Sequence, residues 1–457
     1  MGLSTILPLA ACLGLLHLRD INGASAPAWT VYTIWALAGC IALLELRRAA
    51  GSESAAAAAA APAGFAAFQR QYLAVYLVVM LADWLQGTNM WTLYDSYGVD
   101  ISTLFLTGFC CAAIFSFFAG TIVDSFGRKR GCLLYCALEV VINVLEHYPD
   151  FGTLLAGRVM GGFSTCLLFS VFESWYISAH RARGYPEELI EQTFALATKG
   201  NGLVAVAAGL LAQLAADALG EIGPFQAAIA LTVLAAVLIA AFFDENYGEA
   251  QQRGGTLSEN FAAGVATLRS PAVLLVAIGG TFYEGATYTF VFMWVPVMIG
   301  LVGPPPDMPT GLVFACFMLC ITLGGLLFEL SLEAKSAVEQ VAVVVCAAGT
   351  LSMVACSAFP AHFGVIFPSF LLLELSCGAS YATYATLRAH IIPEGQRATV
   401  TNLLRVPLNL CVVIGTKLTD WYSPATVFPV CATWFGVAML CQVALARQLA
   451  AEKDKAE

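Results

Sequence analysis

Charged residues are scarce in this sequence. Only 11% of its 457 residues are Asp, Glu, Lys or Arg, whereas 59% are hydrophobic. A soluble domain carries about 25% charged residues. The shortfall indicates that most of the chain faces lipid or buried protein, so the formal net charge of -10 says little about partners. The 21 basic residues are not clustered as a nucleic-acid-binding surface requires, and we expect no nucleic-acid partner.

Sequence motifs for catalysis or metal binding are also missing. The five histidines include no pair four residues apart, and the 15 cysteines include no C-x-x-C pair. Most of the cysteines lie inside apolar runs, where they are expected to act as small packing residues. The chain has no nucleophile elbow and no phosphate-binding loop. We therefore expect a protein that is not an enzyme and that uses no metal or other cofactor.

Long apolar segments make up most of the chain, and they are long enough to cross a bilayer. Six are predicted at 72–93, 101–123, 132–147, 152–179, 192–216 and 223–243. Six more are predicted at 272–300, 309–330, 338–357, 363–388, 398–419 and 424–447. This order predicts an all-α multi-pass membrane protein with six-helix bundles at 71–243 and 271–449, a cytoplasmic linker at 244–270 and a cytoplasmic tail at 450–457.

The N-terminal region precedes these bundles. Residues 1–28 hold a short apolar run at 3–18, which fits either a signal-peptide core or an extra helix. Ala24-Ser25-Ala26 resembles a cleavage site, but no basic residue precedes the run. Residues 29–48 are predicted to form an additional transmembrane helix with a basic end. The alanine-rich stretch at 49–70 is predicted to be a linker.

Basic residues occupy alternate connections between the predicted helices. The loop containing Arg128-Lys129-Arg130 is strongly basic, which predicts that it is cytoplasmic. The connections on the opposite side contain neither Lys nor Arg: 94–100, 148–151, 217–222, 301–308 and 358–362. A miscount of one helix would destroy this separation, so the alternation supports twelve helices in the two bundles. Lys417, near the end of the eleventh segment, is the exception.

Four carboxylates lie inside predicted membrane helices: Asp83, Glu173, Glu284 and Glu374. An ionisable group at membrane depth costs about 2.5–3.5 kcal/mol on insertion scales, so each is a candidate for the functional site. They fall on the first, fourth, seventh and tenth segments, which begin the three-helix repeats. Such repeats place the substrate near the midplane at their interface. The alternative is that each carboxylate is a buried, hydrogen-bonded packing residue.

Basic residues are also predicted inside the membrane, at Arg158, Lys199, Arg388 and Arg405. Arg158 lies about 22 Å from Glu173 along one helix, so each of the two needs a partner elsewhere. Arg405 is the first choice for an anion contact, because guanidinium groups bind oxyanions bidentately. The alternative for Arg405 is a gate salt bridge to Asp124 or Glu173.

The stretch from Gly120 to Arg130 has the pattern G-x-x-x-D-x-x-G-R-K. It resembles the cytoplasmic signature loop between helices 2 and 3 of the major facilitator superfamily of secondary transporters. The resemblance implies a cytoplasmic gate made of Gly120, Asp124, Gly127, Arg128 and Lys129. Ser125 stands where many members have Arg, which weakens the usual arrangement of this latch.

Further strings resemble one branch, the molybdate-anion transporter (facilitator domain-5) family. They include Asp83-Trp84-Leu85-Gln86, Phe172-Glu173-Ser174-Trp175-Tyr176, Glu245-Asn246-Tyr247, Glu374-Leu375-Ser376-Cys377-Gly378 and Asn402-Leu403-Leu404-Arg405. The resemblance implies import of molybdate across the plasma membrane by alternating access, with a monomer as the functional unit in the lipid bilayer. The expected substrate and coupling residues are Asp83, Arg158, Glu173, Trp175, Tyr283, Glu284, Glu374, Tyr381, Asn402 and Arg405.

The carboxylates raise an electrostatic problem, because they repel a dianion. Burial raises a carboxyl pKa, so protonation of Glu284 or Glu374 would relieve the repulsion and couple protons to anion uptake. Two alternatives stay open. The aromatic residues near these helices would suit a neutral solute such as a sugar, or the carrier could take another organic anion. A protein of this architecture could also be a scaffold or sensor without transport.

Overall fold

The computed structural model describes residues 14, 27–51, 62–247, 266–305 and 307–456. Thirteen helices account for the regular structure of this part, which contains no strand. The expectations for 1–28 and 49–70 fall largely on residues outside the described ranges. Ten of the helices are long and apolar enough to cross a membrane.

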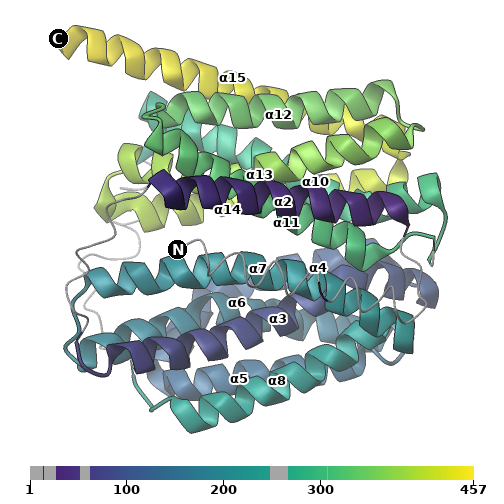
Figure 1. The fold of residues 1–457 in the computed structure, drawn as a ribbon, viewed down its shortest axis with the longest axis vertical. Coiled ribbons are helices and arrows are strands. Elements are labelled where there is room, and N and C mark those ends of the chain that lie inside the picture. The colour runs from purple at the N-terminus through teal and green to yellow at the C-terminus, as the bar shows by residue number, and fades with distance from the viewer. Residues whose placement is uncertain (1–13, 15–26, 52–61, 248–265, 306, 457) are drawn as a thin grey trace. The chain divides into compact units, whose positions relative to one another are not determined.

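Each expected apolar segment from residue 29 onward coincides with one helix. The first group comprises α2 (Ala28–Gly51), α3 (Phe65–Tyr97), α4 (Ile101–Phe126), α5 (Arg128–Leu145), α6 (Phe151–Ala182), α7 (Glu188–Leu219) and α8 (Gly223–Phe242). The second comprises α10 (Pro271–Val302), α11 (Thr310–Glu333), α12 (Val338–Ala358), α13 (Phe363–Ile391), α14 (Glu394–Trp421) and α15 (Pro424–Ala456). The all-α multi-pass fold is therefore confirmed (Figure 1).

Helix ends differ most from the sequence-based expectation at α3 and α15. Helix α3 begins seven residues early, at Phe65, because Phe65 and Phe68 are buried although polar residues follow them. It ends at Gly98, whose φ of 66° is the left-handed conformation that favours glycine. Helix α15 continues to Ala456, through the segment expected to be a tail. Apolarity alone therefore underestimates where a helix continues on polar residues.

The chain forms two compact units. Unit 1 comprises 1–251 with 309–319, and unit 2 comprises 252–308 with 320–457. In unit 1, α3 packs on α7 and α8, while α5 packs on α6 and α8. Unit 2 repeats this pairing: α10 packs on α14 and α15, while α12 packs on α13 and α15 (Figure 1). The two units thus share one plan of helix packing.

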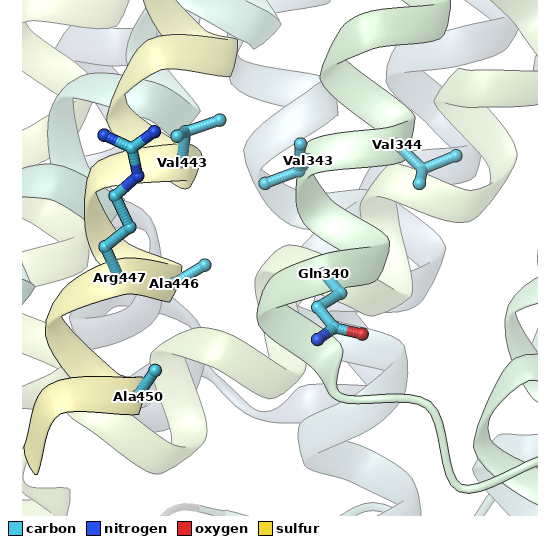
Figure 2. A pocket seen from close by; sticks show the side chains of 7 residues that line it. All are labelled: Gln340, Val343, Val344, Val443, Ala446, Arg447 and Ala450. Carbon is cyan, nitrogen blue, oxygen red and sulfur yellow. The ribbon is translucent and has the colours of Figure 1, made fainter. Parts of the chain in front are cut away.

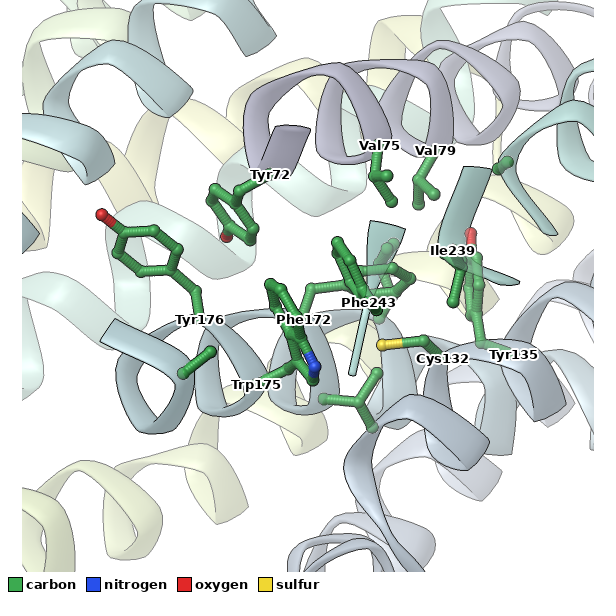
Figure 3. Packing of buried hydrophobic residues seen from close by; sticks show 14 of the residues in the cluster. Tyr72, Val75, Val79, Cys132, Tyr135, Phe172, Trp175, Tyr176, Ile239 and Phe243 are labelled. Atoms are coloured by element: carbon green, nitrogen blue, oxygen red, sulfur yellow. The ribbon is translucent and has the colours of Figure 1, made fainter. Parts of the chain in front are cut away.

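An aromatic cluster joins four helices of unit 1 at one of their ends (Figure 3). Its labelled members are Tyr72, Val75 and Val79 of α3, Cys132 and Tyr135 of α5, Phe172, Trp175 and Tyr176 of α6, Ile239 of α8 and Phe243 just after it. The Trp175 ring stacks on Phe243 with centroids 3.5 Å apart and planes within 5°. These side chains are almost fully buried, so the cluster fixes α3, α5, α6 and α8 against one another.

Glycines allow two helix pairs to touch backbone to backbone. A Cβ on Gly162 of α6 would lie 2.6 Å from Cβ of Cys111 in α4. In unit 2, a Cβ on Gly378 of α13 would lie 2.0 Å from the carbonyl oxygen of Ile321 in α11. Small residues at such crossings replace the hydrophobic driving force that lipid does not supply.

Adding one methyl group at Gly378 tests how closely α13 packs on α11. We expect Gly378→Ala to lower the free energy of unfolding by about 1–3 kcal/mol, because the backbone of α11 must move away. Thermal unfolding of the purified protein in detergent measures the loss. Gly436→Ala is the matched control, since a Cβ there meets no atom within 4 Å. Equal unfolding temperatures for the two variants would contradict the packing described here.

Candidate functional site

The start of α5 is capped by the carboxylate of Glu245. Its oxygens accept hydrogen bonds from the backbone N–H groups of Lys129, at 2.9 Å, and Arg130, at 3.2 Å. The Arg128 N–H donates to the carbonyl of Asn246 at 2.9 Å. A negative charge here also opposes the positive end of the helix dipole. Gly127 has a φ of 110°, and a Cβ there would lie 2.8 Å from this carboxylate. Only glycine fits this position.

The residues on either side of Glu245 bind α6. Trp175 Nε1 donates to the carbonyl of Asp244 at 2.8 Å, and Asn246 Nδ2 donates to the carbonyl of Trp175 at 3.1 Å. Arg183 forms an ion pair with Asp244 at 3.3 Å. Trp175, expected at the substrate site, is therefore buried in the aromatic cluster of unit 1.

The structure places three expected gate residues, Gly127, Arg128 and Lys129, at this cap. Their partner Glu245 was not expected, although Glu245-Asn246-Tyr247 was among the family-like strings. The side chains at 117–126 lie outside the described residues, and Gly120 and Asp124 are among them. Lys129 Nζ donates to the carbonyl of Ala240 at 3.1 Å, so this side chain also joins α5 to α8.

Arg158 is buried in an ion pair with Glu146, the residue after α5. The Tyr94 hydroxyl donates to Glu146 Oε1 at 2.9 Å, and the Arg158 guanidinium lies over the Tyr94 ring, 5.8 Å from its centroid. Arg158 Nη1 also contacts Met90 Sδ at 3.1 Å. The sequence indicated that Arg158 needs a partner other than Glu173, but not that the partner is Glu146. The feature of the sequence that could have identified this partner is the carboxylate of Glu146, near the end of the third apolar segment.

Glu139 is a second buried carboxylate that the sequence analysis missed. Its Oε2 accepts from Gln86 Nε2 at 2.8 Å, and its Oε1 accepts from Ser164 Oγ at 2.5 Å. Asp83 lies within electrostatic range of Glu139 and has no hydrogen bond or ion pair with the described residues. Glu139 lies in the middle of the 132–147 segment, where its charge alone could have marked it.

Glu173 lies apart from these buried groups. Its side chain is exposed and has no hydrogen bond or ion pair in the described part of the chain. It lies within electrostatic range of the Tyr72 and Tyr76 phenols of α3. Tyr76 is also within range of Asp83, so one face of α3 connects the two carboxylates expected in unit 1.

Unit 2 brings several expected residues together between α10 and α13. Glu284 pairs with Arg388 at 3.8 Å, and both side chains are about one-third exposed, at 37% and 29%. Glu374 is only 7% exposed, and it forms no hydrogen bond or ion pair with the described residues. The Tyr381 phenol lies within electrostatic range of both carboxylates. Glu374 is therefore the buried acid of this group that lacks a stabilising partner.

Tyr283 has a structural contact on the same pair of helices. It is buried, and its hydroxyl lies 2.8 Å from Ser376 Oγ. Because Ser376 donates to the carbonyl of Leu373 at 2.7 Å, the Tyr283 hydroxyl is the donor to Ser376. Asn402 and Arg405 belong to α14, which contains Pro407, but their side chains lie outside the described residues. Among the described residues, no group of three or more His, Cys, Asp or Glu could hold a metal.

Comparisons with known proteins agree on one kind of molecule. The MFS_5 family model, described as sugar transporters with 12 transmembrane spans, matches residues 30–363. A molybdate-anion transporter of Xenopus laevis is 31% identical over 428 residues, covering 90% of this chain and 93% of the relative. One of Takifugu rubripes is 32% identical over 417 residues, covering 83% and 84%. The crystal structure of the nucleoside transporter NupG superimposes with a TM-score of 0.64 at 10% identity, covering 83% of this chain and 98% of that one. This last likeness confirms the fold alone.

Removing one member of the buried ion pair tests its contribution. We expect Arg158→Met to lower the free energy of unfolding by about 3–5 kcal/mol, because Glu146 then stays buried without a counter-charge. The double variant Arg158→Met/Glu146→Gln should recover most of this loss, as measured by thermal unfolding in detergent. Arg181→Met breaks an exposed pair with Glu187 and should leave the unfolding temperature nearly unchanged. If the loss of stability in the double variant equals the sum of the losses in Arg158→Met and Glu146→Gln alone, the two residues do not stabilise the protein as a pair.

Proposed function

Because this chain belongs to the MFS_5 family of the major facilitator superfamily, we propose that it imports the oxyanion molybdate across the plasma membrane. The similarity to molybdate-anion transporters over 90% of the chain carries this proposal. The family is one of transporters, so the chain is not an enzyme. In this proposal transport proceeds by alternating access, through movement of the predicted bundles at 71–243 and 271–449, and one chain suffices.

The Glu284–Arg388 pair supports a route for an anion in unit 2. The 3.8 Å separation and the partial exposure of both side chains make this pair easier to open than the buried Arg158–Glu146 pair. Once Glu284 takes up a proton, Arg388 can offer its guanidinium to an oxyanion in the bidentate geometry that such groups favour. Arg405 supplies the second cation in this proposal, and Asn402 supplies an amide donor. When the pair opens, the substrate oxyanion therefore replaces the Glu284 carboxylate as the partner of Arg388.

Glu374 takes up a proton in this mechanism as well as Glu284. An ionised carboxylate buried without a partner is costly, so the neutral acid is the stable form in the absence of a counter-charge. A neutral Glu374 also removes one negative charge from α13, the helix that carries Arg388. Loading of proton and anion thus become linked, which makes the carrier a proton–oxyanion symporter. Asp83 of unit 1 stays a candidate for a further protonation site.

A neutral sugar is the second candidate substrate. The description of the family model favours it, and so does Tyr381, whose ring is 61% exposed on α13 beside the two carboxylates. Aromatic faces bind sugars by apolar contact, and the nearby carboxylates accept hydrogen bonds from hydroxyl groups. Binding of a neutral sugar requires no cation at the site, so the two candidate substrates differ in the role that Arg388 and Arg405 would have.

Uptake of labelled molybdate by the purified protein in liposomes tests the substrate. We expect uptake that rises with an inward proton gradient and that excess tungstate suppresses, since tungstate is the same kind of tetrahedral dianion. Sulfate and sugars are the comparison competitors. Suppression by a sugar but not by tungstate would move the assignment to the second candidate. Folded protein without any flux would favour a scaffold or sensor.

Two glutamine substitutions separate the roles of the carboxylates. We expect Glu374→Gln to keep downhill uptake but to lose its dependence on the proton gradient, because the side chain is then permanently neutral. Glu284→Gln should lose this dependence too, while raising anion affinity because Arg388 is released. Glu187→Gln, in an exposed cytoplasmic pair, is the control and should respond to the gradient as the native protein does. If Glu284→Gln and Glu374→Gln both keep the gradient dependence of the native protein, coupling through these two carboxylates is refuted.

A further inference from the structure

A groove runs between α12 and α15 on unit 2, with a volume of about 470 Å³. It is lined by Gln340, Val343, Val344, Val443, Ala446, Arg447 and Ala450 (Figure 2). Five of these seven side chains are valine or alanine. Val344 is 67% exposed, as expected of a residue that faces lipid. The lining of this groove between two membrane helices is therefore mostly apolar, with one cation, Arg447.

Arg447 has no hydrogen bond or ion pair with the described residues. The nearest acid that follows it on α15, Glu452, accepts from Gln448 Nε2 at 3.0 Å. Figure 2 shows the Arg447 guanidinium at the level of Val443, so the charge points back along α15, away from Ala450. Helical side chains generally lean toward the N-terminus in this way. The guanidinium thus lies beside the apolar wall of the groove, on a residue that is exposed at the surface of the described chain.

The charge pattern of the chain places this end of the groove at the cytoplasmic face. Lys335 precedes α12 and Lys453 follows the groove on α15, and both belong to connections on the basic side of the membrane. Arg447 lies one to two turns inside that face, level with the first turns of α12. A cation at this depth in an apolar setting needs an anionic partner. The cytoplasmic leaflet supplies one in its anionic lipids.

We propose that this groove binds one anionic phospholipid of the cytoplasmic leaflet. Arg447 holds the phosphate through its paired N–H groups, and the Gln340 amide donates to a headgroup or glycerol oxygen. The valine and alanine side chains receive the first part of an acyl chain. The lipid spans α12 and α15, so it also stabilises the packing of these two helices. This site is independent of the transported substrate and of the coupling mechanism.

Native mass spectrometry of the full-length protein tests the proposal. The protein is delipidated, then equilibrated with a mixture of phosphatidylcholine and phosphatidylglycerol. We expect the native chain to retain one phosphatidylglycerol, and Arg447→Gln to bind it about tenfold more weakly, as the loss of a charge-assisted contact implies. Arg269→Gln is the control, because it removes another exposed cytoplasmic cation that does not line the groove. It should retain the lipid.

A second variant keeps the charge and removes the space. Ala446→Phe fills the groove beside Arg447 and should lose the same lipid, whereas thermal unfolding in neutral detergent should show that both groove variants stay folded. Equal phosphatidylglycerol retention by the native chain and Arg447→Gln would overturn the proposal. So would displacement of the lipid by millimolar inorganic phosphate, which would indicate a site for a free anion. Conversion of dimers to monomers by Arg447→Gln would assign the groove to contact between copies of the chain.

Discussion

A charge inside a bilayer has no water to stabilise it, so the protein must provide its partner. This constraint explains the pairs found between the helices. Arg158 is paired with Glu146 and Tyr94, and Glu139 accepts from Gln86 and Ser164. These contacts join α3, α5 and α6, so each charge also determines how its helices pack. Glu374 differs because it has no such partner in the described part of the chain, which is why it is the centre of the proposed mechanism.

The two units use one packing plan for different chemistry. Gly162 and Gly378 mark the close crossings of α6 with α4 and of α13 with α11. Four residues before these glycines stand Arg158 and Glu374, on the same face of their helices. One unit thus holds a paired cation where the other holds an acid that has no hydrogen bond or ion pair with the described residues. The two units keep the same helix packing, while the side chain at this position, Arg158 or Glu374, determines the local charge.

The sequence was enough to predict the helices and their order, because length and apolarity decide which segments cross a membrane. It did not predict the partners of the charges. Glu146 lies twelve residues before Arg158, on the other side of a turn, and only the packing of α5 on α6 brings the two together. Glu139 was overlooked inside an apolar run, and the stacking of Trp175 on Phe243 was not predicted. Such pairings depend on how helices rotate about their axes, which apolar periodicity defines poorly.

The cap at the start of α5 has a consequence for how the signature loop can vary. Glu245 contacts the backbone N–H groups of Lys129 and Arg130, which every residue except proline provides. Apart from an ion pair of 3.8 Å between Arg130 Nε and Glu245, the cap itself therefore places little demand on the side chains at these two positions. Gly127 and Glu245, in contrast, have no equivalent substitutes, since one provides the space and the other provides the charge. Mutational drift should accordingly be tolerated more readily in the basic residues than in this glycine–glutamate pair, although the two lie 118 positions apart.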